Sequence, residues 1–208
     1  MAEHDRHYEP DNSGMYELEF PGPQLSSADG RGPVLVHALE GFSDAGHAVK
    51  LAAAHLRDSL DTELVASFAI DDLLDYRSRR PTMTFKTDRF TAYEDPQLGL
   101  YALHDSVGTP FLLLAGMEPD LKWERFVTAV RLLAERLGVR RTIGLGAIPM
   151  AVPHTRPITM TAHSNDRALI SDHTAWVGEV QVPGSASSLL EYRLAQHGQE
   201  VVGYTVHI

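Results

Sequence analysis

The chain has 208 residues, of which 18 are Lys or Arg and 28 are Asp or Glu, so its formal net charge is −10 at pH 7. This length suits one domain with a sizeable core, and the acidic balance argues against general binding to nucleic acid or to anionic membranes. Cysteine is absent, which excludes disulfides, thiolate metal ligands and a cysteine nucleophile. With no signal peptide and no membrane-spanning segment in the pattern, we expect a cytoplasmic protein.

Two patterns predict regular structure along the chain. Apolar runs of strand length indicate strands, several of them buried on both faces of a sheet. Apolar residues at helical spacing indicate helices, and the clearest helix ends at Gly138. In chain order, strands are predicted at 15–20, 33–39, 62–70, twice within 82–95, at 98–106, 109–118, 140–149, from 176 and at 200–208, and helices at 45–60, 122–138 and 185–198.

The alternation of these elements predicts an α/β fold, a three-layer sandwich with a central mixed, mostly parallel sheet. Residues 1–14 are polar and acidic, and we expect them to be a disordered tail before a single domain at 15–208. Because the sequence stops on an apolar strand, we also expect a further C-terminal helical part. The histidines and acids after residue 160 lack the spacing of metal-ligand pairs, so neither a metal site nor a cofactor is predicted.

The segment GFSDAG (41–46) joins a predicted strand to a predicted helix. Ser43 stands in a G-x-S-x-A pattern that resembles a degenerate nucleophile elbow, which would need a histidine and an acid from elsewhere in the chain. Ser43 or Asp44 could instead cap the helix by accepting hydrogen bonds from its first N–H groups. The turn could also bind an anion at the helix N-terminus. The pattern favours the cap and leaves the nucleophile and the anion site open as alternative hypotheses.

The segment DYRSRRP (75–81) brings three arginines together in an acidic protein. Arg77, Arg79 and Arg80 could clamp a phosphate or a carboxylate. They could instead pair with acidic residues of the chain itself, namely Asp71, Asp72, Asp75 or Glu118. The sequence favours internal pairing, and Arg77 and Arg80 are the arginines that we assign to the candidate pocket.

The segment GMEPD (116–120) ends a buried strand and precedes the clearest helix. Asp120 is well placed as the N-cap of that helix. Glu118 could pair with an arginine or serve as a general base. Because ligand sites in open α/β sheets lie at the carboxyl ends of the strands, GMEPD should meet the two preceding motifs and the later PHTRP segment at one rim.

The segment PHTRP (153–157) follows the next buried strand and presents His154, Thr155 and Arg156 between two prolines that stiffen the loop. His154 could carry a proton, and Arg156 could bind an anion. Both could equally tie down the loop or face a neighbouring subunit.

These motifs, in this order over residues 41–157, resemble the actinobacterial branch of the proteasome assembly chaperone 2-like family. The resemblance implies an α/β fold similar to that of the purine nucleoside phosphorylase and peptidyl hydrolase group. It also implies a role in binding and assembly, because the eukaryotic relatives are chaperones of the proteasome α-ring without known catalysis. No catalytic role carries over with the motif residues, which are Asp44, Arg77, Arg80, Glu118, Asp120, His154, Thr155 and Arg156.

Three hypotheses about function follow. The first is a non-catalytic assembly or interaction protein, a homo-oligomer with proteasome subunits as further partners. The second is a phosphorylase- or hydrolase-like enzyme, or a small-anion-binding protein, in which arginines hold the anion and Glu118 or His154 moves a proton. The third is a purely structural ion-pair network. The candidate pocket is the same in all three and consists of Ser43, Asp44, Arg77, Arg80, Glu118, Asp120, His154, Thr155 and Arg156.

Overall fold

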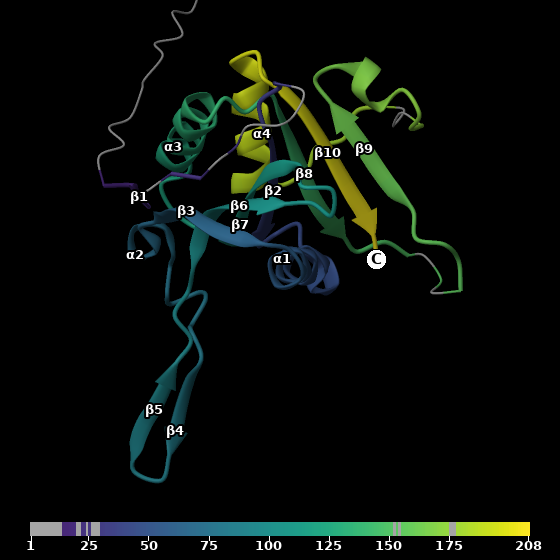
Figure 1. The fold of residues 1–208 in the computed structure, drawn as a ribbon. Coiled ribbons are helices and arrows are strands. Elements are labelled where there is room, and N and C mark those ends of the chain that lie inside the picture. Colours follow the sequence, from purple (N-terminus) through teal and green to yellow (C-terminus); the bar gives the residue numbers. More distant parts are fainter. Residues whose placement is uncertain are drawn as a thin grey trace, which may run out of the picture.

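The computed structural model describes residues 14–19, 22–23, 25, 30–151, 153, 155–174 and 178–208. It confirms the α/β fold, with helices packed on both faces of an eight-stranded mixed sheet (Figure 1). The strands are β1 (Tyr16–Leu18), β2 (Val34–Glu40), β3 (Thr62–Phe68), β4 (Met83–Lys86), β5 (Arg89–Tyr93), β6 (Leu98–His104), β7 (Pro110–Met117), β8 (Arg141–Ile148), β9 (Met160–Ser164) and β10 (Glu200–His207). The helices are α1 (Ala48–Ser59), α2 (Ile70–Leu73), α3 (Trp123–Arg136) and α4 (Ala186–Gln196), with short 3₁₀ turns at Ala45–His47 and Arg167–Ile170.

The strand order of the main sheet is β1-β3-β6-β7-β2-β8-β10-β9. Its centre is parallel, because β7, β2, β8 and β10 pair side by side in the same direction. The flanking pairs are antiparallel. β2 and β3, which the sequence joins through α1, are therefore separated by β7 and β6. The parallel centre brings the carboxyl ends of four strands to one edge, which we call the rim.

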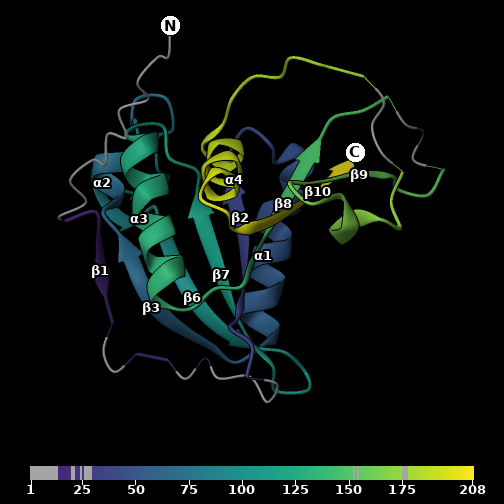
Figure 2. The ribbon, with the colours of Figure 1, turned by 90° about the horizontal axis from the view of Figure 1, so that it is seen from above.

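Two apolar layers hold the sandwich together. Figure 2 shows α3 and α4 on one face of the sheet and α1 on the other. Each buried aliphatic or aromatic side chain contributes about 1.5–3 kcal/mol through removal from water. The larger layer includes Phe126 and Leu133 from α3 with Leu190 and Leu194 from α4, and the smaller layer includes Val49 and Ala53 from α1.

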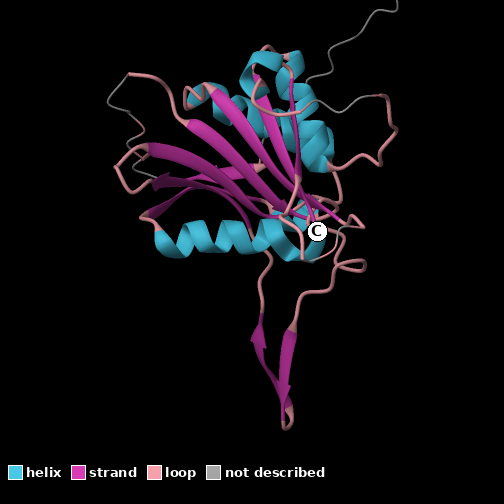
Figure 3. Ribbon diagram, turned by 90° about the vertical axis from the view of Figure 1, so that its right-hand side faces the viewer, coloured by secondary structure: helices cyan, strands magenta, loops and turns pink. Residues whose placement is uncertain are grey.

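β4 and β5 form a separate two-stranded sheet, which we call the hairpin (83–93). The two strands were predicted, but their isolation from the main sheet was not. Figure 3 shows the hairpin extending away from the sandwich. All nine residues of its two strands are exposed. The hairpin leaves the body immediately after the DYRSRRP motif, so this motif lies at its base.

One predicted strand was wrong and one strand was missed. The described residues 178–184 of the expected strand form no strand, and Val180 and Val182 are 61% and 71% exposed. β9 instead forms within a segment that reads as a polar loop, because it pairs antiparallel with β10 at the sheet edge. Alternation of apolar residues marks a strand only where a neighbouring strand is available to pair with it.

Candidate functional site

A cleft of about 580 Å³ opens at the rim, where β2 and β7 end. Its volume lies within the usual range for ligand pockets. Three of the four predicted motifs contribute to it, together with the start of α3 and the segment before α4. The lining residues are Glu40, Gly41, Phe42, Asp44, His47, Lys50, Ser78, Arg79, Met117, Glu118, Pro119, Asp120, Trp123, Gly184 and Ser185.

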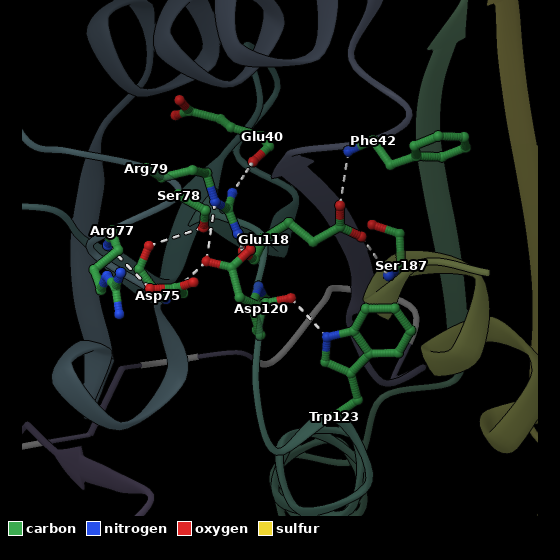
Figure 4. Close-up of polar contacts among 11 residues, drawn as sticks. Glu40, Phe42, Asp75, Arg77, Ser78, Arg79, Glu118, Asp120, Trp123 and Ser187 are labelled. Carbon is green, nitrogen blue, oxygen red and sulfur yellow. Dashed lines mark hydrogen bonds and ion pairs between the residues drawn. The ribbon is translucent and has the colours of Figure 1, made fainter. Parts of the chain in front are cut away.

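Glu118 is buried at the floor of the cleft, with 5% of the residue exposed. Its Oε2 accepts the backbone N–H of Phe42 at 2.8 Å, and its Oε1 accepts the backbone N–H of Ser187 at 3.0 Å (Figure 4). Ser187 lies in the first turn of α4, so the carboxylate satisfies an N–H group that the helix leaves free. A Cβ atom on Gly41 would lie 1.9 Å from Oε2. Glycine at this position therefore makes room for the Glu118 carboxylate.

Arg79 joins several backbone segments beside Glu118. Its guanidinium forms a fork with Asp120, with Nη2 at 2.5 Å from Oδ1 and Nε at 3.1 Å from Oδ2. Nη1 donates to the Glu40 carbonyl at 3.2 Å, and Nη2 also donates to the Glu118 carbonyl. Asp120 Oδ2 further accepts the backbone N–H of Asp75 at 2.9 Å. We call this set of contacts the rim network, and Figure 4 shows its side chains. The network links the ends of β2 and β7 to the segment that precedes the hairpin.

Asp120 does not cap α3, contrary to the sequence-based expectation. The N-cap position is Lys122, which has φ 56° and makes no capping hydrogen bond with its side chain. At the start of the helix, the Trp123 indole N–H donates to the Pro119 carbonyl at 2.7 Å. The carboxylate of Asp120 is directed to Arg79 because that fork is a charge-assisted, bidentate contact.

Asp44 fulfils the expected capping role in GFSDAG. Its Oδ1 accepts the N–H of Val49 at 2.7 Å and of Lys50 at 3.4 Å in the first turn of α1. The hydroxyl of Ser43 makes no hydrogen bond with any residue that the structure describes, whereas its backbone carbonyl accepts the N–H of Ala147 at 2.7 Å. The turn therefore docks on β8, and its geometry does not prepare Ser43 for nucleophilic attack, which needs a hydrogen-bonded base.

Four of the other predicted residues do not line the cleft. Arg77 and Arg80 are exposed, and their side chains form no hydrogen bond or ion pair within the described ranges. Thr155 and Arg156 are likewise exposed and do not line the cleft. His154 lies outside the described residues. Of the three clustered arginines, the structure thus places the middle one in the site and directs the other two to solvent.

A second polar cluster was not predicted and lies under α4. Glu191 of α4 contacts two histidines, with its Oε1 at 3.1 Å from Nε2 of the buried His37 and its Oε2 bonded to Nε2 of His163. Strand register aligns His37, Gly144, Gly203 and His163 across β2, β8, β10 and β9. The two glycines leave the space above the sheet that the three side chains fill. A Cβ on Gly144 would lie 1.9 Å from Glu191 Oε1, and one on Gly203 would lie 2.1 Å from the His163 ring.

The Glu191 carboxyl and the His163 ring shift each other's pKa in opposite directions. Burial raises the pKa of the Glu191 carboxyl, but its bonds with His163 and His37 outweigh this effect and lower the pKa to about 2. The bond to Glu191 raises the pKa of His163 against the opposing effect of burial. The ion pair between His163 and Glu191 joins the edge strand β9 to α4. The cluster forms only when β2, β8, β10 and β9 lie side by side in the correct register, so no local pattern in the sequence predicts it.

Among the described residues, no group of three or more histidines and acids has the arrangement needed to hold a metal ion. Within the same residues, no helix is both long enough and apolar enough to cross a membrane.

Comparison with known proteins gives one family match. The model of the PAC2 family matches residues 38–208. No curated protein matches the chain. A Mycobacterium tuberculosis protein of unknown function has a similar solved structure, with 80% sequence identity, TM-score 0.92, and coverage of 98% of this chain and 71% of that chain.

Two further solved structures share the fold. A Corynebacterium glutamicum protein of unknown function is 47% identical, with TM-score 0.89 and coverage of 95% of this chain and 73% of that one. A Mycobacterium tuberculosis proteasome-assembly chaperone homologue is 22% identical, with TM-score 0.76 and coverage of 84% and 75%.

Proposed function

The chain belongs to the PAC2 family, and we propose that it is a non-catalytic interaction protein that assembles with other protein chains through its projecting hairpin. The hairpin is the observation that carries this proposal. An isolated two-stranded hairpin is marginally stable in water, and exposed apolar clusters on soluble proteins mark interaction sites. Here the exposed fractions of the large apolar side chains are 50% for Met83, 60% for Phe85, 64% for Phe90 and 48% for Tyr93.

The hairpin is suited to bind because its aromatic side chains are already ordered against each other. The rings of Phe85 and Phe90 meet edge to face with centroids 5.2 Å apart. Large aromatic side chains presented in a fixed arrangement lose little conformational entropy on binding and are common anchors of protein interfaces. A partner that covered this pair would gain the apolar burial that the hairpin lacks in the isolated chain.

The rim network supports the same proposal, since it fixes the base of the hairpin. Arg79 stands four residues before β4 and is bonded to Asp120 and to two backbone carbonyls. A stiff base directs the hairpin along one line and lowers the entropic cost of docking. In this proposal, the motif residues that suggested an active site hold the base of the binding hairpin in place.

The geometry favours this role over catalysis. Among the described residues at the cleft, Glu118, Asp44 and Arg79 are engaged with backbone groups or with another side chain. The Ser43 hydroxyl makes no hydrogen bond with a base in the part of the chain that the structure describes. A nucleophile paired with a base, or an acid free to exchange a proton with a ligand, is the arrangement that an enzyme of the second hypothesis would need.

We further propose that the partners are copies of this chain and proteasome subunits, and that the binding takes place in the cytoplasm. The self-association rests on the uncovered apolar hairpin. The proteasome partner rests on family membership together with the fold shared with a proteasome-assembly chaperone homologue. The compartment rests on the lack of cysteine, which fits a reducing environment.

Light scattering of a hairpin variant tests the proposal. We expect the wild-type chain to be an oligomer and the double variant Phe85→Ser, Phe90→Ser to dissociate, because apolar contact area is lost at the interface. Leu51→Ser is the matched control, since Leu51 is 64% exposed on α1, away from the hairpin. A wild-type monomer that also fails to bind proteasome α-subunits at tens of micromolar would contradict the proposal, as would an oligomer that the double variant leaves intact.

A further inference from the structure

The two faces of the hairpin differ in their chemistry. Successive side chains of a strand point to opposite faces, and residues directly opposite each other on two paired strands share a face. The register of β4 with β5 therefore gives the hairpin one apolar face, which consists of Met83, Phe85, Phe90 and Tyr93. The same register places Lys86 opposite Arg89 on the other face, beside the turn. Figure 3 shows the hairpin standing clear of the sandwich, so neither face is covered by the main sheet or its helices.

The basic face is unfavourable in the isolated chain. Lys86 and Arg89 stand directly opposite each other, and like charges in such positions destabilise strand pairing. Asp88 lies 3.9 Å from Arg89, but both side chains are exposed, and ion pairs in water contribute little to stability. An acidic surface placed over this face would relieve the repulsion between the two cations.

The surplus of positive charge includes the base of the hairpin as well. Residues 77–93, which we call the arm, contain five Lys or Arg and one acidic residue, a net charge of +4. Because the whole chain carries −10, the remaining residues, which we call the body, carry −14. The side chains of Arg77, Arg80 and Lys86 form no hydrogen bond or ion pair within the part of the chain that the structure describes. The arm of one copy is therefore electrostatically complementary to the body of another.

This complementarity favours one mode of contact over two others. Two hairpins packed through their apolar faces would leave both basic faces in water and would place two arms of like charge side by side. A nucleic acid would meet the positive charge of the arm, but the acidic body would repel it, and its phosphates could not cover the apolar face. An acidic protein surface can cover the apolar face and bring carboxylates to the basic one.

We propose that the hairpin of one copy docks on the body of a second copy, with its basic face directed to acidic residues there. The proposal rests on the proposed function and names the two surfaces that meet. Every chain then has two roles, because it gives its hairpin to a neighbour and receives a hairpin on its body. Such an unlike-surface contact closes into a ring where the rotation permits, and the smallest closed form is a pair that exchanges hairpins.

A mixing experiment separates hairpin-to-body contact from hairpin-to-hairpin contact. The Phe85→Ser, Phe90→Ser variant has lost the apolar face of its hairpin but keeps an unchanged body. It is labelled with heavy nitrogen and mixed with the unlabelled wild-type chain, and native mass spectra of the mixture are recorded. We expect mixed assemblies that contain the variant, because its body still receives wild-type hairpins. Wild-type assemblies that exclude the variant would overturn the proposal.

Charge reversal tests the role of the basic face. Lys86→Glu, Arg89→Glu should weaken assembly about tenfold in light scattering, because the hairpin then carries the same sign of charge as the body. Arg140→Glu, Arg156→Glu is the matched control, since it changes the net charge equally at exposed positions of the body, and it should not weaken assembly. About 0.5 M NaCl should weaken assembly of the wild-type chain through screening. Equal weakening by the two double variants would contradict the proposal.

Other outcomes keep this inference distinct from the proposed function. A wild-type monomer that binds proteasome α-subunits through its hairpin would reject the inference and leave the proposed function standing. So would an oligomer that the Phe85→Ser, Phe90→Ser variant dissociates but charge reversal leaves intact. Binding of a fluorescent single-stranded oligonucleotide that charge reversal abolishes would assign the basic face to nucleic acid and overturn the inference. A wild-type monomer that binds no α-subunit contradicts both.

Discussion

Replacement of Arg79 by alanine tests the rim network most sharply. The substitution removes the fork to Asp120 and the bonds to the Glu40 and Glu118 carbonyls. Breaking a fully buried ion pair costs about 3–5 kcal/mol because one charge is left unpaired. The Arg79 and Asp120 side chains are each 25% exposed, so water relieves part of this penalty. We expect a loss of about 2–3 kcal/mol in the free energy of unfolding.

The assay is urea or thermal unfolding of Arg79→Ala and of two comparison variants, Arg77→Ala and Arg79→Lys. For a chain of this size the loss corresponds to a fall of about 5–10 °C in Tm. Arg77→Ala is the matched control, and its exposed side chain should change stability by less than about 0.5 kcal/mol. Arg79→Lys should lie between them, because lysine keeps the charge and loses the planar fork. Equal stability of Arg79→Ala and Arg77→Ala would refute the structural role given to the network.

Three further predictions concern packing and pH. Gly41→Ala should lower Tm by displacing the Glu118 carboxylate, as measured by thermal unfolding, whereas Gly184→Ala, with no atom within 4 Å of its added Cβ, should not. Gly203→Ala should break the contact of His163 with Glu191, because the added methyl group would meet the His163 ring. The His163 ring signals in NMR spectra should then titrate nearer the ordinary pKa of histidine. An unchanged titration would contradict the role given to Gly203 in making room for His163. The ion pair should contribute fully between the ordinary pKa values of 4.5 for glutamate and 6.5 for histidine; its contribution should fade as the pH falls towards 2 or rises through the raised pKa of His163. Stability measured against pH in His163→Gln should lack the change on the alkaline side and show a smaller change on the acid side, because His37 remains bonded to Glu191. A profile identical to that of the wild-type chain would contradict the assignment.

The sequence predicts local structure well where one element carries its own signal. The stripe of α3 and the long apolar runs of β2, β7 and β8 are such cases, and the structure has all four. Gly138 and Gly198, expected to end helices, have φ of 67° and 80°, which glycine adopts without strain. The cap by Asp44 belongs to the same class, because it depends on six consecutive residues.

Other features depend on contacts between segments that are distant in the sequence, so no local pattern predicts these features. Three arginines within four residues have the same chemistry, and only the path of the turn directs Arg79 to Asp120. The row of His37, Gly144, Gly203 and His163 needs the register of four strands. The projection of the hairpin is equally non-local, since the alternation in its strands resembles that of a strand in the main sheet.

A native mass spectrum of the wild-type chain tests the central claim, that this is an interaction protein assembled through its hairpin. The spectrum reports the number of subunits and any retained small molecule in one measurement. We predict an oligomer that carries no small anion and that becomes a monomer in the Phe85→Ser, Phe90→Ser variant. A wild-type monomer with a tightly held anionic ligand would contradict the claim and favour the enzyme hypothesis.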